Sequence, residues 1–173
     1  MSGISIYDIA IPTFTKGLNA LEHILRTAER FAEENGLDAN ATYPNARLIE
    51  DQNPLIFQVQ NVTKTIKINI DRLTGVESEP FEDDEQAFND LYARINATRE
   101  LLKTVEPGVS NARANVLVDL LAGGKPIQLS VKDAIIGHGI PNFIFHITTG
   151  YSILRAKGVP LGKADFICSF VGL

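Results

Sequence analysis

The strongest constraint on the fold is a stretch near the carboxyl end, residues 131–157, that is apolar on most sides when drawn as a helix. A helix of this kind is typical of a buried position, so other elements are expected to surround it. Gly137, Gly139 and Pro141 predict a kink or a late start in its first half, and Gly158 predicts its end. One apolar stripe follows spacings of three and four residues and consists of Ile136, Ile140, Phe143, Ile147, Tyr151 and Leu154. Three further apolar residues lie elsewhere around the helix: Ile135, Phe145 and Ile153.

Three earlier stretches each carry a single apolar stripe and are predicted to be amphipathic helices. The first begins near Thr13, after Pro12, and ends at Asn35–Gly36. The second runs from about Pro54 to Leu73. The third begins in the acidic segment 81–85, with Asp83 or Asp84 as N-cap, and ends before Pro107. The connector 36–53 is long for a simple helix turn, which predicts a crossover running along the bundle.

The apolar period changes between the third and last helices. Residues 115–122 and 125–130 read as two short strands joined by Gly123–Gly124, a turn that favours positive φ angles. The chain is therefore expected to be one mainly α domain over residues 1–173. Its predicted architecture is a four-helix bundle with a long crossover and a short β-hairpin, at about 115–130, before the last helix.

Composition excludes several classes of protein. The chain has 16 Lys and Arg against 21 Asp and Glu, a net charge of −5, which argues against nucleic acid as a partner. Its single cysteine, Cys168, excludes an internal disulfide and is interpreted as an inert thiol. No apolar run reaches the roughly 20 residues of a membrane span, and residues 1–8 lack secretory features. We therefore expect a cytoplasmic protein with no membrane partner.

The best candidate for a site is a polar pair, Asn142 and His146, inside the apolar last helix. Residues four apart share a helix face, and buried polar groups cost free energy unless they are bonded. His146 could be a hydrogen-bonded core histidine, an anchor of a small-molecule pocket, or a metal ligand. His138 lies one turn earlier, whereas His23 falls opposite the first helix's stripe and is expected to face solvent.

No hydrolase signature accompanies this pair. The chain has no nucleophile elbow, Cys168 has no base beside it in the sequence, and Gly123–Gly124 lacks the features of a phosphate loop. The acidic segment 81–85 is interpreted as a charged helix start. His146 is then the only plausible general acid or base near neutral pH, with Asn142 beside it. Other polar residues are expected to line the same cavity between the second and last helices: Gln58, Gln60, Asn61, Lys64, Tyr151 and His138.

Many short motifs resemble a helical-bundle family of bacteria and fungi, without established function, in the DinB/YfiT-like superfamily of proposed metalloenzymes. The resemblance covers nearly the whole chain and implies a bundle with a long crossover, a hairpin, and often a homodimer. The residues that carry it are Tyr7–Asp8, Pro12 and Phe14, 54–60, Arg72–Leu73 and Gly75, Phe81, Asp83 and Glu85, Gly123–Gly124, Pro141–Asn142 with Phe145–His146, and 158–166.

The same resemblance implies a divalent metal held by three histidines, one on the second helix and two four apart on the last. His146 matches the final histidine, but Asn142 occupies the one before it. The second helix offers Gln58, Asn61, Lys64 and Thr65 where a histidine would be needed. No cofactor is therefore predicted. The preferred reading is a small-molecule-binding bundle, in which metal-independent catalysis is possible; a divergent metalloenzyme with His146 as ligand and a non-catalytic dimeric module are the alternatives.

Overall fold

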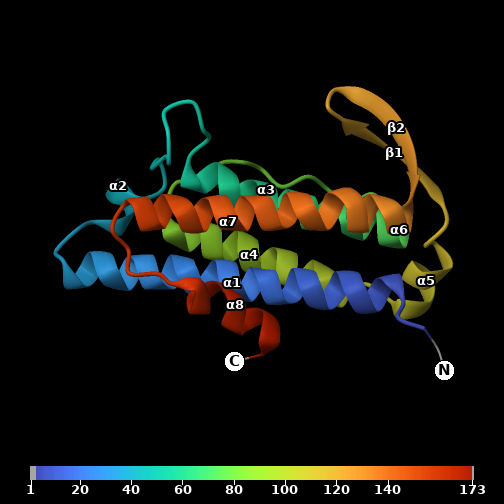
Figure 1. Cartoon of the computed structure of the whole chain (residues 1–173), viewed down its shortest axis with the longest axis horizontal. Coiled ribbons are helices and arrows are strands. Elements are labelled where there is room, and N and C mark those ends of the chain that lie inside the picture. Colours follow the sequence, from blue (N-terminus) through green and yellow to red (C-terminus); the bar gives the residue numbers. More distant parts are fainter. Residues whose placement is uncertain (1–2, 173) are drawn as a thin grey trace.

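The computed structural model describes residues 3–172 and has four long helices packed side by side (Figure 1). They are α1 (Ile6–Glu34), α3 (Leu55–Thr74), α4 (Phe88–Lys103) and α7 (Ile140–Ala156). Contacts join α1 to α7, α7 to α3, α3 to α4 and α4 back to α1, which makes a closed ring around one core. The predicted four-helix bundle is thus confirmed.

Helix α1 begins seven residues earlier than predicted, and Pro12 lies inside it. Ser5 and Asp8 form a capping box at its start, in which each side chain accepts a hydrogen bond from the other residue's backbone N–H. Pro12 leaves the carbonyl of Asp8 without its usual donor, but Asp8 is exposed, so water can bond it. A strong cap and a solvated carbonyl together tolerate the proline.

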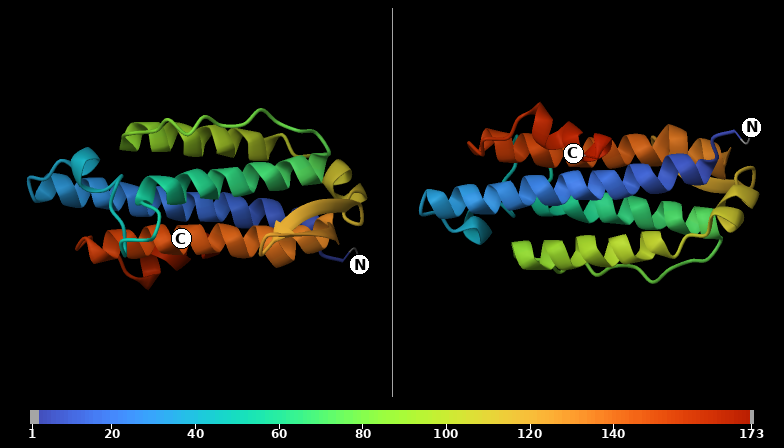
Figure 2. Two further views of the ribbon diagram at one scale, coloured as in Figure 1. Left: turned by 90° about the horizontal axis from the view of Figure 1, so that it is seen from above. Right: turned by 90° about the horizontal axis from the view of Figure 1, so that it is seen from below.

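The long crossover is residues 75–87, and the prediction that 36–53 would run along the bundle was wrong. Residues 35–54 fold back at one end, around the short helix α2 (Ala39–Thr42), where the Ile56 N–H donates to the carbonyl of Pro44. Residues 75–87 instead return along the bundle, as both views of Figure 2 show. Their contacts run antiparallel to α3: Ser78 bonds Asp71, Asp83 pairs with Lys64, and Glu85 bonds Gln60.

The acidic segment 81–85 belongs to this crossover and does not begin α4, which corrects the predicted N-cap. Arg94 explains the difference, because it is buried and forms ion pairs with Asp83 and Glu85. The carboxylate that caps α4 is Asp90, which accepts from the backbone N–H groups of Gln86 and Ala87. A short helix that was not predicted, α5 (Pro107–Ala112), follows α4.

The predicted hairpin is confirmed as β1 (Leu117–Ala122) and β2 (Lys125–Ser130), antiparallel strands with Leu120 opposite Ile127. It projects from the end of the bundle (Figure 1). The chain then enters α6 (Val131–Ala134) and a π-helical turn, η1 (Ile135–Gly139), before α7. The π turn is the irregularity that Gly137, Gly139 and Pro141 predicted.

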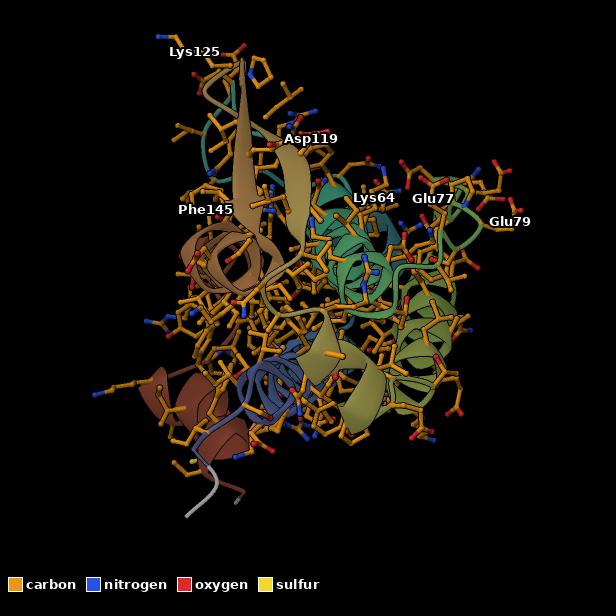
Figure 3. The ribbon with its side chains drawn as sticks, turned by 90° about the vertical axis from the view of Figure 1, so that its right-hand side faces the viewer. Lys64, Glu77, Glu79, Asp119, Lys125 and Phe145 are labelled. Carbon is orange, nitrogen blue, oxygen red and sulfur yellow. The ribbon has the colours of Figure 1, made fainter. Side chains whose placement is uncertain are left out.

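The last helix is less buried than its composition predicts. Phe143 and Ile147 are fully buried, and Phe143 packs edge-on against Phe14 of α1 with ring centroids 5.1 Å apart. Ile136 and Phe145, however, are 43% and 57% exposed. Phe145 of α7 and Ile136 of η1 are therefore apolar side chains open to solvent. Figure 3 shows Phe145 on α7, on the side from which the hairpin projects.

The C-terminal segment forms α8 (Lys163–Val171), which packs against α1. Phe166 contacts Tyr151 edge-on, at a centroid distance of 6.3 Å. His23 is exposed, as predicted, but it also pairs with Asp165 of α8 at 2.9 Å. Within residues 3–172, no helix combines the length and the apolar character that crossing a bilayer requires.

Candidate functional site

The site is a polar seam between α3 and α7, which run antiparallel. Nδ1 of His146 lies 2.8 Å from Oε1 of Gln58, and Nδ2 of Asn142 donates to the hydroxyl of Thr65 at 2.7 Å. His146 and Asn142 are one turn apart on α7, while Gln58 and Thr65 are two turns apart on α3. The structure thus joins both predicted anchors to the second helix, as expected for a site between these two helices.

A third contact extends the seam toward the hairpin. Gly139 lies so close to Asn69 that a Cβ at Gly139 would come within 2.6 Å of the Asn69 amide. Asn69 is buried, donates to the carbonyl of Thr65 and accepts from Arg72. Sequence reasoning named Thr65 only as a position where a metal-binding histidine would be needed, and it missed Asn69 as a member of this seam. The signal was their spacing from Gln58, at seven and eleven residues, which keeps one helix face.

The bonds of Gln58 determine the tautomer of His146. The Gln58 Nε2 donates to the carbonyl of Asn53 at 2.9 Å, so its Oε1 is the atom that meets the imidazole. A carbonyl oxygen only accepts, and the hydrogen-bond network therefore assigns the proton of the neutral ring to Nδ1. Nε2 then carries the lone pair. Among the described residues it has no hydrogen-bond partner, and it is not among the buried unsatisfied atoms, so it keeps access to solvent.

Two phenylalanines flank the imidazole. Phe145 lies next to it with a centroid distance of 5.3 Å, and Phe57 of α3 lies at 6.2 Å, both in edge-to-face geometry. These rings and the adjacent helices exclude water from part of His146, and this burial lowers its pKa below the ordinary value of 6.5. Near neutral pH the side chain is a neutral hydrogen-bond acceptor and potential base.

The other predicted lining residues divide between different faces. Asn61 is adjacent to the seam, with its amide donating to the carbonyl of Phe57. Gln60 and Lys64 point to the crossover instead, where they contact Glu85 and Asp83. Figure 3 shows Lys64 on the crossover side of α3 and Phe145 on α7. Since a helix turns about 100° per residue, positions 60 and 64 cannot share the face of 58 and 65.

Tyr151 and His138 are also separated from His146. Tyr151 turns toward α8, where it contacts Phe166. His138 lies in the π turn, so the regular spacing that would align it with Asn142 is broken. Its Nδ1 is buried and has no partner among the described residues. The structure therefore does not bring all the predicted residues into one cavity. Of the six predicted lining residues, only Gln58 and Asn61 lie at the seam with His146 and Asn142.

The residues present do not fit the three-histidine metal site that the resemblance implied. The amide of Asn142 is turned to Thr65, and the α3 residue that faces His146 is a glutamine. Across residues 3–172, no three His, Cys, Asp or Glu side chains are grouped closely enough to hold one ion. The acidic segment 81–85 likewise pairs with Lys64 and Arg94.

Comparisons with known proteins place the chain in a family and support its fold. A search of curated proteins found no match to the chain. A crystal structure of a DinB family member protein from Shewanella denitrificans is similar, with a TM-score of 0.83 and 36% sequence identity, over 93% of this chain and 90% of that one. A model of a domain of unknown function, DUF1993, matches residues 6–167. The chain therefore belongs to the DUF1993 family and has the DinB-like fold.

Proposed function

We propose that this protein binds a small molecule at the α3–α7 seam, with Nε2 of His146 as the recognition group. The observation that carries the proposal is the tautomer of His146. The side-chain oxygen of Gln58 accepts the hydrogen bond of Nδ1–H, which leaves an accessible lone pair on Nε2. The lowered pKa keeps this lone pair available near neutral pH. We also propose a cytoplasmic location, as expected from the sequence.

The surroundings indicate what such a ligand would present. An acceptor at Nε2 favours an O–H or N–H donor, and the rings of Phe57 and Phe145 favour an apolar body beside it. If the donor proton moves to Nε2 in a bound substrate, His146 acts as a general base, and Asn142 orients the neighbouring part of the ligand. The proposed chemistry uses no metal, and the donor set of one imidazole and two amides supports that choice.

A fragment screen by ligand-observed NMR tests the proposal. Fragments with a phenol O–H, or with an indole or amide N–H, are expected to bind the wild type. They should lose binding in His146→Phe, which keeps an aromatic ring at this position and removes the acceptor nitrogen. His23→Phe, on an exposed part of α1, is the matched control. Binding should also weaken as the pH falls through the pKa of His146. Equal binding of every hit to wild type and His146→Phe would refute the proposal.

A homodimeric interaction module is the second candidate, and the hairpin favours it. Leu117 and Leu121 are 63% and 68% exposed on one face of a two-stranded sheet, which is marginally stable alone. The C-terminal helix α8, whose apolar residues could pack within the chain or join an oligomer contact, packs against α1 of its own chain. A Leu117→Ser/Leu121→Ser variant should convert a dimer into a monomer in sedimentation velocity; a wild-type monomer up to high concentration would exclude this module.

A further inference from the structure

A hollow of about 350 Å³ lies at the end of the bundle where α3 and α4 both terminate. Its walls come from the last turns of these two helices, the start of the crossover and the short helix α5. Figure 2 shows α3 and α4 ending at the same end of the bundle, close to α5. Ile70 in this wall is twelve residues from Gln58, about 18 Å along α3. The hollow is therefore separate from His146 and does not rest on the proposed function.

Apolar side chains form much of the lining. Ile70 of α3 is buried and Leu101 of α4 is half-buried. Val76 of the crossover and Val109 of α5 are 67% and 46% exposed, so two valines of the lining remain open to solvent. The volume is that of a pocket for a small organic molecule. Such a lining favours a hydrocarbon group in the ligand.

The hydroxyl groups of the lining are already bonded within the protein. Those of Thr74 and Thr104 donate to carbonyls one turn earlier in their own helices, at 2.9 and 2.8 Å. The backbone N–H and the hydroxyl of Ser78 both donate to Oδ1 of Asp71, which fixes the start of the crossover on α3. The polar atoms that can still bond a ligand are therefore carboxylate oxygens: Oδ2 of Asp71 and the two oxygens of Glu106.

The hollow carries a surplus of negative charge. Asp71 and Glu106 line it, and the described lining includes no Lys or Arg. Asp71 has Lys67 at 3.8 Å, and Lys103 pairs with Glu100 instead. Glu106 forms no ion pair within residues 3–172 and bonds no backbone N–H at the start of α5. The carboxyl ends of α3 and α4 each add about half a negative charge, which the start of the short α5 offsets only in part.

We propose that this hollow binds a small primary amine with an apolar body. Its ammonium group lies at the carboxylates of Glu106 and Asp71, and its hydrocarbon part lies against Ile70, Leu101 and Val109. An ammonium group donates up to three hydrogen bonds, and bonds between charged groups are stronger than neutral ones. Glu106 contributes most of the charge attraction, because Lys67 already offsets Asp71.

Phenethylammonium chloride is the probe, titrated at constant ionic strength while the backbone amide resonances are followed by NMR. Saturable shifts are expected around the hollow, at Val76 and Val109 among others. Glu106→Gln should weaken binding roughly tenfold, the effect of one lost charge-assisted hydrogen bond. Glu34→Gln, which removes an exposed carboxylate from the end of α1, is the matched control and should leave binding unchanged. Methylammonium, which lacks the apolar body, and phenylacetate, which reverses the charge, should both bind far more weakly.

Loss of folding does not imitate the expected result, because Glu106 is exposed and unpaired, and circular dichroism checks each variant before titration. Shifts that rise linearly with the amine, or equal affinity in the wild type and Glu106→Gln, would overturn the site. Shifts confined to α3 and α7 around His146 would place the amine at the seam and would also overturn it. Equal binding of phenylacetate and the amine would overturn the assignment to a cation.

Discussion

The side chain of Gln58 in α3 holds Nδ1 of His146 in α7 at 2.8 Å, and the same amide donates to the carbonyl of Asn53. A residue outside α7 thus decides which imidazole nitrogen faces outward. A glutamine does this without adding charge, so the ring is oriented while its pKa stays lowered by burial.

Replacing this glutamine with a carboxylate should reverse the pKa shift. In the wild type, the His146 imidazole is expected to titrate below 6.5, and in Gln58→Glu above it, because the carboxylate stabilises the protonated ring. Gln86→Glu, in the exposed part of the crossover, adds the same charge elsewhere and should leave the pKa unchanged. Imidazole NMR resonances followed against pH measure all three values. A pKa that stays low in Gln58→Glu would contradict the assigned contact.

The lowered pKa of His146 also predicts how stability depends on pH. Between the folded and unfolded pKa values the unfolded chain binds more protons, so the free energy of unfolding rises with pH in that window. The contribution is fully present above the unfolded value of about 6.5 and is lost as the pH falls toward the folded pKa. Urea unfolding at a series of pH values should show this slope in the wild type. His146→Gln should remove that part of the slope, and an unchanged profile would refute it.

Arg94 is expected to be the most important charge for holding the crossover. It is 4% exposed and donates to the Glu85 carboxylate, the Glu82 carbonyl and the Thr63 hydroxyl, all at 2.6 Å. Arg94→Met leaves Glu85 buried without its cation, which should lower the free energy of unfolding by about 3–5 kcal/mol. Lys103→Met breaks only the exposed pair with Glu100 and should change it by about 0–1 kcal/mol. Denaturant melts of both variants measure the contrast. Similar losses in the two would contradict the central role of Arg94.

Gly17 of α1 leaves the space that the Phe143 ring of α7 fills. A Cβ at this position would lie 2.2 Å from the ring of Phe143, which is fully buried. Gly17→Ala should therefore destabilise the protein by about 1–3 kcal/mol, although alanine is the better helix former. Gly108→Ala, in α5 with open space around it, is the matched control and should be neutral or slightly stabilising. Thermal melts of the two variants measure the difference. Equal midpoints would show that α1 and α7 accommodate the added methyl group without cost.

The helices and hairpin were predictable because apolar spacing follows the buried face directly, as in Val59, Val62 and Ile66. The path of the connections was not. Residues 81–85 read locally as a helix start, but Arg94, nine residues beyond Glu85, together with Lys64 and Gln60 of α3 holds them in an extended crossover. The site was predictable in part, since His146 and Asn142 share a face within α7. Which residues of α3 meet them depends on the rotation of that helix, and this placed Gln58 and Thr65 there but turned Gln60 and Lys64 away.

The donor set at the seam also predicts the metal content. His146 offers one free nitrogen, and its neighbours Gln58 and Asn142 are amides committed to other hydrogen bonds, which makes a poor zinc or nickel site. Protein purified without a histidine tag is expected to carry far less than one zinc, nickel or iron per chain by elemental analysis. Its melting temperature should not change on dialysis against chelator, because we expect no bound metal to contribute to folding. One retained metal per chain, lost on chelation and absent from His146→Ala, would instead establish the metalloenzyme alternative and make His146 a ligand.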